Sequence, residues 1–187
     1  MSNYRRAFVP GGTYFFTVAT AHRRPLLTRP AVRRALRAGI DQARQTLPFT
    51  IDAWIFLPDH LHCIWTLSPE DANFSARWAI IKRQVSHEYG EAEWCVGRTL
   101  PELSASRHKR RESGIWQRRF WEHLIQDEED LRHHVEYIHW DPVKHEYVEA
   151  VADWPYSTFH RFVQRGLYPS NWGGQGVQEL SGEAFGE

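Results

Sequence analysis

Residues 49–67 read FTIDAWIFLPDHLHCIWTL, and this stretch decides the fold. Two runs rich in β-branched and aromatic residues, 49–57 and 61–67, are separated by Pro-Asp-His at 58–60. Such runs favour strands, and Pro and Asp are typical turn residues. The stretch therefore predicts two antiparallel strands joined by a tight hairpin.

Segments on both sides of this hairpin show the periodicity of strands or of amphipathic helices. The order of the expected elements is β, α, β, β, α, β, α. The first six predict an α+β fold of ferredoxin-like (split βαβ) type, an antiparallel sheet with helices on one face. Besides the hairpin, the expected strands are 13–20 and 115–125. The expected helices are 31–47, 75–89 and 127–140. Ser75 is the expected N-cap and Gly90 the expected stop of the second helix, and Pro142 should end the third within a turn.

The chain of 187 residues has the length of one domain with a tail. We expect a domain over residues 1–150 and a C-terminal tail, 151–187, that packs on this domain and whose last ~15 residues are loose. The polar segment 91–114 predicts an exposed loop. Neither an apolar run of membrane-spanning length nor an apolar signal region is present, so we expect a cytoplasmic protein.

The net charge of zero hides an uneven distribution of charge. Residues 1–50 carry nine arginines and one acid, Asp41, whereas residues 121–187 carry four basic and thirteen acidic residues. Such asymmetry indicates a surface that binds a polyanion, and the alternative is a solvated, arginine-rich helix face. The two cysteines, Cys63 and Cys95, lack the number and spacing of a disulfide scaffold or a zinc site.

The sequence His60-Leu61-His62 opens the second strand of the hairpin. Because side chains alternate along a strand, both histidines face one side of the sheet while Leu61 faces the core. Two imidazoles on one face are able to chelate a divalent metal ion. The alternative is a pair of half-exposed histidines without a ligand.

The last predicted helix carries Tyr137 and Asp141, which share one face because they are four residues apart, with His134 on the same side. A metal ion held by His60, His62 and Asp141 would polarise a phosphodiester while Tyr137 attacks phosphorus. Imidazole suits Mn or Zn better than Mg, but DNA-processing chemistry favours Mg or Mn. The alternative for Tyr137 is an aromatic residue of the core with its hydroxyl at the rim.

Several motifs in this order resemble the REP-associated tyrosine transposases, a family of HUH single-tyrosine transposases. The resemblance runs from about Tyr4 to Trp172 and rests on YRR at 4–6, GGTYFFTV at 11–18, DAWIFLPDHLHCIWTL at 52–67, RFWEH at 119–123, HHVEYIHWDPVKH at 133–145 and DWPYSTFHRFVQRGLYP at 153–169. It implies that His60 and His62 are the metal pair and Tyr137 the nucleophile. Asp141 stands where the family commonly has Asn, and Glu146 where it commonly has Gly.

The resemblance also implies an activity and a partner. The expected enzyme is a metal-dependent single-stranded DNA endonuclease and strand transferase, with Mg or Mn as cofactor, that forms a 5′-phosphotyrosine intermediate. Its expected partners are single-stranded hairpins of repetitive extragenic palindromes (REP) with a short flanking tetranucleotide. We expect a monomer, cytoplasmic and nucleoid-associated. Phosphate contacts are expected from guanidinium groups, namely Arg5, Arg6, Arg23, Arg24, Arg118 and Arg119.

Two other functions are open from the sequence. A ferredoxin-like sheet that presents aromatic residues would suit a non-catalytic module that binds single-stranded DNA or RNA, although a clear RNP1 pattern is missing. A rolling-circle replication initiator would share the same chemistry. The short chain without a helicase part argues against this second alternative.

Overall fold

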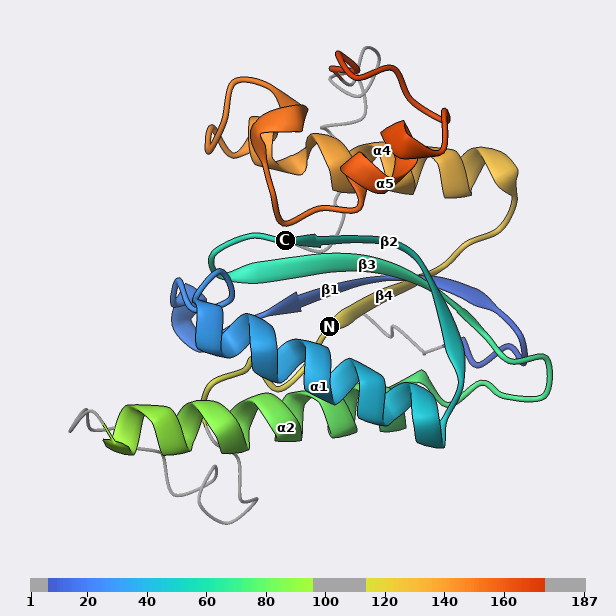
Figure 1. Ribbon diagram of the computed structural model, residues 1–187. Coiled ribbons are helices and arrows are strands. Elements are labelled where there is room, and N and C mark those ends of the chain that lie inside the picture. Colours follow the sequence, from blue (N-terminus) through green and yellow to red (C-terminus); the bar gives the residue numbers. More distant parts are fainter. Residues whose placement is uncertain (1–6, 96–113, 174–187) are drawn as a thin grey trace, which may run out of the picture.

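The computed structural model describes residues 7–95 and 114–173, with the backbone alone over 91–95. Its centre is a four-stranded antiparallel sheet in the order β2-β3-β1-β4. Together with α1 and α2 these strands follow each other as β1, α1, β2, β3, α2, β4, the ferredoxin-like order, which confirms the expected α+β fold (Figure 1). The bounds are β1 Thr13–Ala19, α1 Pro30–Thr46, β2 Phe49–Phe56, β3 His60–Leu67, α2 Phe74–Cys95 and β4 Trp121–Leu124.

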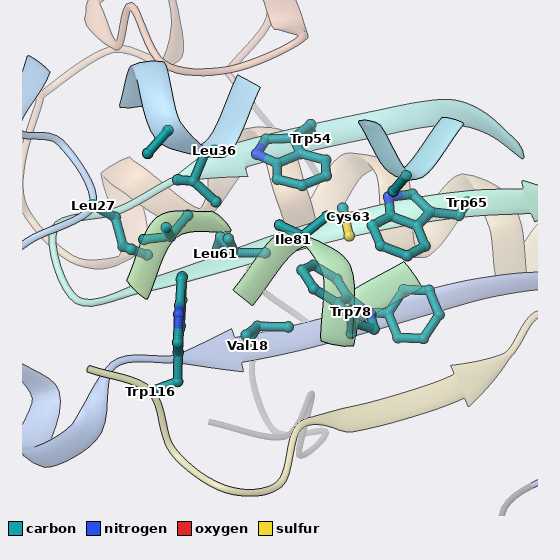
Figure 2. Close-up of a cluster of buried hydrophobic side chains, with 14 of the residues drawn as sticks. Val18, Leu27, Leu36, Trp54, Leu61, Cys63, Trp65, Trp78, Ile81 and Trp116 are labelled. Carbon is teal, nitrogen blue, oxygen red and sulfur yellow. The ribbon is translucent and has the colours of Figure 1, made fainter. Parts of the chain in front are cut away.

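Helices α1 and α2 cover one face of the sheet, as Figure 1 shows. The core between them and the sheet is aromatic, and the rings of Trp65 on β3 and Trp78 on α2 stack at 4.4 Å (Figure 2). The two helices approach closely at Gly39, where an added Cβ would lie 3.1 Å from the Cα of Ile81. A larger residue at this position would push α1 away from α2.

The opposite face of the sheet is covered by α4, Glu128–Lys144 (Figure 1). The expectation of helices on one face therefore holds for α1 and α2, but the third helix packs on the other side. A second apolar cluster fills the space between this face and α4, and it includes Phe15 and Ile64 from the sheet and Ile138 from α4. The helix begins after Asp127, whose side chain accepts a hydrogen bond from the Asp130 amide, and it ends two residues after Pro142, as expected.

Helix α2 differs from its predicted bounds at both ends. The side chain of Asn73 accepts a hydrogen bond from the Ala76 amide at 3.0 Å, so Asn73, not Ser75, caps the helix. At the other end, the helix continues through Gly90 to Cys95. A glycine costs a helix interior only about 1 kcal/mol, so Gly90 does not end it. Residues 91–95 of the expected loop are thus helical, and residues 96–113 lie outside the described residues.

The tail after residue 150 lies along the outer edge of β2. The Phe56 amide donates to the carbonyl oxygen of Tyr156 at 2.9 Å, and the Trp54 amide donates to the Thr158 hydroxyl at 2.9 Å. These contacts satisfy backbone groups that a bare edge strand leaves open. The tail contains a 3₁₀ turn, η2, Val151–Asp153, and a short helix, α5, Phe159–Gln164. The end that we expect to be loose, 174–187, lies outside the described residues.

His139 on α4 anchors this tail. Its Nε2 lies 2.9 Å from the Thr158 hydroxyl, and its ring packs on Phe162 and Tyr168. Burial, aided by the charge of Arg161, lowers the pKa of His139 to about 3, so the imidazole stays neutral.

Among the described helices, none combines the length and apolar character that crossing a membrane requires.

Arg77 holds the entry to α2 in place. The residue is fully buried, and its guanidinium donates to the carbonyl oxygens of Leu47, Pro48 and Asn73 at 3.1, 2.6 and 3.0 Å. It also forms an ion pair with Asp71 at 2.8 Å. One side chain thereby ties the end of α1 to the start of α2.

We predict that Arg77→Met lowers the free energy of unfolding by about 3 kcal/mol, because three carbonyl oxygens and the carboxylate of Asp71 lose their buried donor. Urea denaturation followed by circular dichroism measures the change. The control is Arg83→Met, at an exposed position of the same helix, which should stay within about 0.5 kcal/mol of the unsubstituted protein. Equal stability of the two variants would contradict the role assigned to Arg77.

Candidate metal and nucleophile site

The start of β3 places two histidines on the face that α4 covers. Leu61 and Cys63 point into the core under α1 and α2, as Figure 2 shows. His60 and His62, which alternate with them, therefore face the other side, and they are 1% and 0% exposed. The structure thus has both imidazoles on one face, as the sequence predicts, but they are buried and not half-exposed.

Each histidine is oriented by a hydrogen bond to its Nδ1 atom. The carboxylate of Asp59 lies 2.8 Å from Nδ1 of His60, and the hydroxyl of Thr17 on β1 lies 2.9 Å from Nδ1 of His62. A partner at Nδ1 fixes the ring and leaves Nε2 for a metal ion. The sequence analysis missed Asp59 and Thr17, although the position of Asp59 directly before His60 was a signal.

Asp141 meets these two rings from α4. Its Oδ2 atom lies 3.4 Å from Nε2 of His62 and 3.7 Å from Nε2 of His60. Burial alone would raise the pKa of this carboxyl, but the charge of His62 and the neighbouring imidazoles of His145 and His60 outweigh it and lower the pKa to about 2. Asp141 is therefore a carboxylate at neutral pH. The expected third ligand lies beside the expected metal pair.

A fourth donor, His145, comes from the residue after the end of α4. Its Nε2 lies 3.4 Å from Oδ1 of Asp141, and one ligand atom each of His60, Asp141 and His145 lies within 4.8 Å of the others. The sequence analysis missed His145, whose spacing of four residues from Asp141 was the available signal. Directly after it, Glu146 has a φ of 58°, the left-handed conformation that glycine favours, so this chain keeps that backbone shape without a glycine.

These residues fit a divalent cation. Within the described part of the chain, Nε2 of His60 and both carboxylate oxygens of Asp141 are buried and have no hydrogen-bond partner. Separations of 3.4 to 3.7 Å exceed hydrogen-bond length but suit two ligand atoms that each lie about 2.0–2.2 Å from one ion. Burial lowers the pKa of His60, yet the neighbouring carboxylates of Asp141 and Asp59 raise it overall, as expected beside negative charge that would attract a cation.

Tyr137 lies one turn before Asp141 on α4 and is fully buried. Its ring packs against the ring of His62 at 5.4 Å, beside the candidate metal ligands. The Nζ atom of Lys144 donates to the Tyr137 hydroxyl at 3.0 Å and lies 4.8 Å from the ring centroid. The predicted nucleophile therefore has a cation at its hydroxyl, and the sequence analysis missed Lys144.

His134, which shares a predicted helix face with Tyr137, belongs to a different cluster. The Asp130 carboxylate lies 2.8 Å from Nδ1 of His134 and 2.8 Å from Nε2 of His123 on β4. The rings of the two histidines stack at 4.6 Å. Because hydrogen bonds already occupy these nitrogen atoms, the cluster ties β4 to α4.

The arginines predicted to contact DNA have different surroundings. Arg23 forms an ion pair with Asp59 at 3.3 Å and so lies next to the candidate metal ligand His60. Arg24 donates to the carbonyl oxygen of Gly114 at 2.8 Å, and it connects two segments of the fold. Arg118 and Arg119 are exposed before β4. Arg5 and Arg6 lie outside the described residues, and DNA contact stays a prediction for the other four.

Comparison with known proteins identifies the family. No family model matches the chain. It is 45% identical to the REP-associated tyrosine transposase of Escherichia coli K12, over 98% of each chain, and 42% identical to a putative one of Haemophilus influenzae, over 98% of this chain and 99% of the relative. A solved REP-associated tyrosine transposase bound to a REP hairpin superimposes with a TM-score of 0.75 and 47% identity, over 92% of this chain and 91% of the other.

The class is that of transposases, which are DNA-processing enzymes. This chain belongs to the family of REP-associated tyrosine transposases. The resemblance inferred from the sequence motifs is thereby confirmed.

We predict that the protein binds one Mn²⁺ through His60, His62 and Asp141. Isothermal titration calorimetry should show at least 10-fold weaker binding in His62→Ala and in Asp141→Ala, because each loses one ligand. The control is His123→Ala, which removes a nitrogen from the other histidine cluster and should leave the affinity unchanged. Unchanged affinity in Asp141→Ala, or loss in His123→Ala, would contradict this assignment.

Proposed function

We propose that this protein is a metal-dependent endonuclease and strand transferase that acts on single-stranded REP hairpins through a 5′-phosphotyrosine intermediate. The observation that carries the proposal is the arrangement of Tyr137 and Asp141 on α4 against His60 and His62 on β3. Membership of the transposase family and the hairpin bound in the solved relative support the substrate class.

The metal-binding residues and Tyr137 would have separate roles in this reaction. The ion would be held by His60, His62 and Asp141, with His145 as a further donor beside Asp141. A bound divalent ion would polarise a phosphoryl oxygen as a Lewis acid. Tyr137 Oη forms a bond to phosphorus while the bond from phosphorus to the 3′ oxygen breaks. The tyrosine loses its proton, and the 3′ oxygen gains one. Attack by a free 3′-OH reverses these steps and joins strands without an external energy source.

Lys144 is the cation that the reaction at Tyr137 requires. Its ammonium group lies 3.0 Å from the hydroxyl that becomes negatively charged as it loses its proton. A positive group at this distance in a buried site stabilises developing charge more strongly than water does. The preceding two turns of α4 hold Asp141 and Tyr137 in register with Lys144.

Access to Tyr137 requires side chains to move. The residue is 0% exposed, so a phosphate reaches its hydroxyl only after atoms over it shift. Lys144 is half-buried and has a long, flexible side chain, which allows it to follow the phosphate. Binding of DNA and ordering of the reactive groups are therefore coupled in this proposal.

The first prediction for the reaction concerns the nucleophile. With Mn²⁺ or Mg²⁺ and an end-labelled REP hairpin, a denaturing gel should show a covalent protein–DNA band that EDTA and Tyr137→Phe both abolish. Hairpin affinity on native gels should stay within about 2-fold, because the missing hydroxyl lies inside the protein. The control Tyr147→Phe changes an exposed tyrosine and should retain the band. Binding without a covalent band in the unsubstituted protein would favour a non-catalytic binding module.

A second prediction concerns Lys144. In single-turnover cleavage, Lys144→Gln should reduce the rate about 100-fold, the scale of losing one charge-stabilising donor, without weakening hairpin binding to a similar degree. Lys144→Arg should recover most of the rate because it keeps the positive charge. If Lys144→Gln cleaves at the normal rate, or if Lys144→Arg is as slow as Lys144→Gln, the lysine has no charge-stabilising role.

A further inference from the structure

The backbone beside the candidate metal ligands is strained at two adjacent residues. His22 and Arg23, in the 3₁₀ turn η1, Ala21–Arg23, have φ angles of 57° and 51°. This left-handed region favours glycine, because Cβ of any other residue comes too close to the following carbonyl oxygen. Among the described non-glycine residues, the only other positive φ belongs to Glu146, directly after His145. Strain of this kind persists only where the surroundings enforce it, and it clusters at functional sites.

The turn is fastened to the hairpin loop that leads into β3. The Thr20 amide donates to the carbonyl oxygen of Asp59 at 2.8 Å. The Thr20 hydroxyl lies 3.0 Å from the same oxygen and 2.8 Å from the carbonyl oxygen of Arg24. Further along, the Leu27 amide donates to the carbonyl oxygen of Pro58 at 2.8 Å. Both ends of segment 20–27 are thus held against residues 58 and 59, which keeps the residues between them in the strained conformation.

This conformation brings the side chain of Arg23 onto Asp59. Its Nη1 atom donates to Oδ2 of Asp59 at 3.3 Å, while Oδ1 of the same carboxylate lies 2.8 Å from Nδ1 of His60. Burial by itself would raise the pKa of Asp59, but the hydrogen bond and charge of His60 and the charge of Arg23 lower it overall. Asp59 is therefore a carboxylate that has a guanidinium at one oxygen and a candidate metal ligand at the other.

The ion pair of Arg23 and Asp59 contributes little to folding. The side chain of Arg23 is 40% exposed, and water screens an ion pair at such a position. Stability therefore does not explain why the chain keeps two left-handed residues here. The orientation of the Asp59 carboxylate does explain it, because a proton on Nδ1 of His60, donated to Asp59, leaves the lone pair of Nε2 for a metal ion.

We propose that Arg23 is a positioning residue of the metal site, which acts on His60 through Asp59 without touching the ion. The proposal rests on the proposed metal site and adds one more side chain to its support. Without Arg23, the Asp59 carboxylate is free to turn toward solvent, and His60 loses the acceptor that keeps its proton on Nδ1. A proton on Nε2 then competes with the ion for the same lone pair. This role differs from phosphate contact because it operates in the absence of DNA.

Isothermal titration calorimetry of the DNA-free protein with Mn²⁺ tests the proposal by the direction of the change. Loss of a positive charge near a cation site would by itself strengthen Mn²⁺ binding. We expect instead about 5-fold weaker binding in Arg23→Gln, somewhat less than the loss of about 10- to 100-fold that follows removal of a direct partner of a metal ligand. Arg23→Lys should stay within about 2-fold of the unsubstituted protein, because the contact uses one donor nitrogen and the charge is kept. The midpoint of thermal unfolding should shift by less than about 2 °C in both variants.

A double-variant cycle shows whether Arg23 acts through Asp59. Asp59→Ala should weaken Mn²⁺ binding about 10-fold or more, and Arg23→Gln should then cause no further loss, because the carboxylate that it orients is gone. The matched control is Arg132→Gln, which breaks exposed ion pairs with Glu129 and Glu136 that involve none of the candidate ligands. Its affinity for Mn²⁺ should be unchanged.

The possible results separate the role of Arg23 from the metal site and from the reaction. Unchanged or stronger binding in Arg23→Gln, an equal loss in Arg132→Gln, or a further loss in the Asp59→Ala background would overturn the role of Arg23 and leave the metal site intact. If the unsubstituted protein binds no Mn²⁺, the metal site is wrong, and the role of Arg23 with it. Weaker Mn²⁺ binding in Arg23→Gln, without any covalent band in the unsubstituted protein, would support the role of Arg23 and overturn the proposed reaction.

Discussion

The alternation of side chains along β3 is the constraint on which the other features depend. Leu61, Cys63 and Trp65 build the aromatic core with α1 and α2, while His60 and His62 face α4. A shift of one residue in the register of β3 would place the histidines among the tryptophans and turn the apolar core residues toward α4. Burial of the core thus fixes the direction of the imidazoles, and stability and the metal site have the same physical origin.

Both faces of the sheet are covered, and α4, which covers the second face, also carries the proposed nucleophile and candidate metal ligands. Helix α4 packs on the sheet through residues such as Ile138, and the same turns present Tyr137 and Asp141 to the histidines. Lys144 and His145 follow within one turn, so one helix positions the proposed nucleophile, its cation and two donors for the ion. Burial makes each of these charges interact strongly, because little water screens them.

The tail has two consequences for the surface. It satisfies the open edge of β2 through Tyr156 and Thr158, which removes a site where another strand would pair. It also brings Arg161 and Arg165 into one groove with Arg33, Arg37 and Arg44 of α1. Arginines from the basic first fifty residues and from the acidic C-terminal part therefore lie in the same groove, although they are far apart in the sequence.

The sequence by itself determined the element order and the hairpin, because strand and helix periodicity and turn chemistry are local properties. Its motifs also singled out His60, His62, Tyr137 and Asp141 as candidate site residues. It also contained the motifs that identify the family. Only the tertiary structure decided that α4 packs opposite α1 and α2, that α2 continues through Gly90, and that Lys144 reaches the tyrosine hydroxyl. These features depend on contacts between residues that are distant in the sequence and on packing that outweighs weak local preferences. A short stretch of sequence contains neither kind of information.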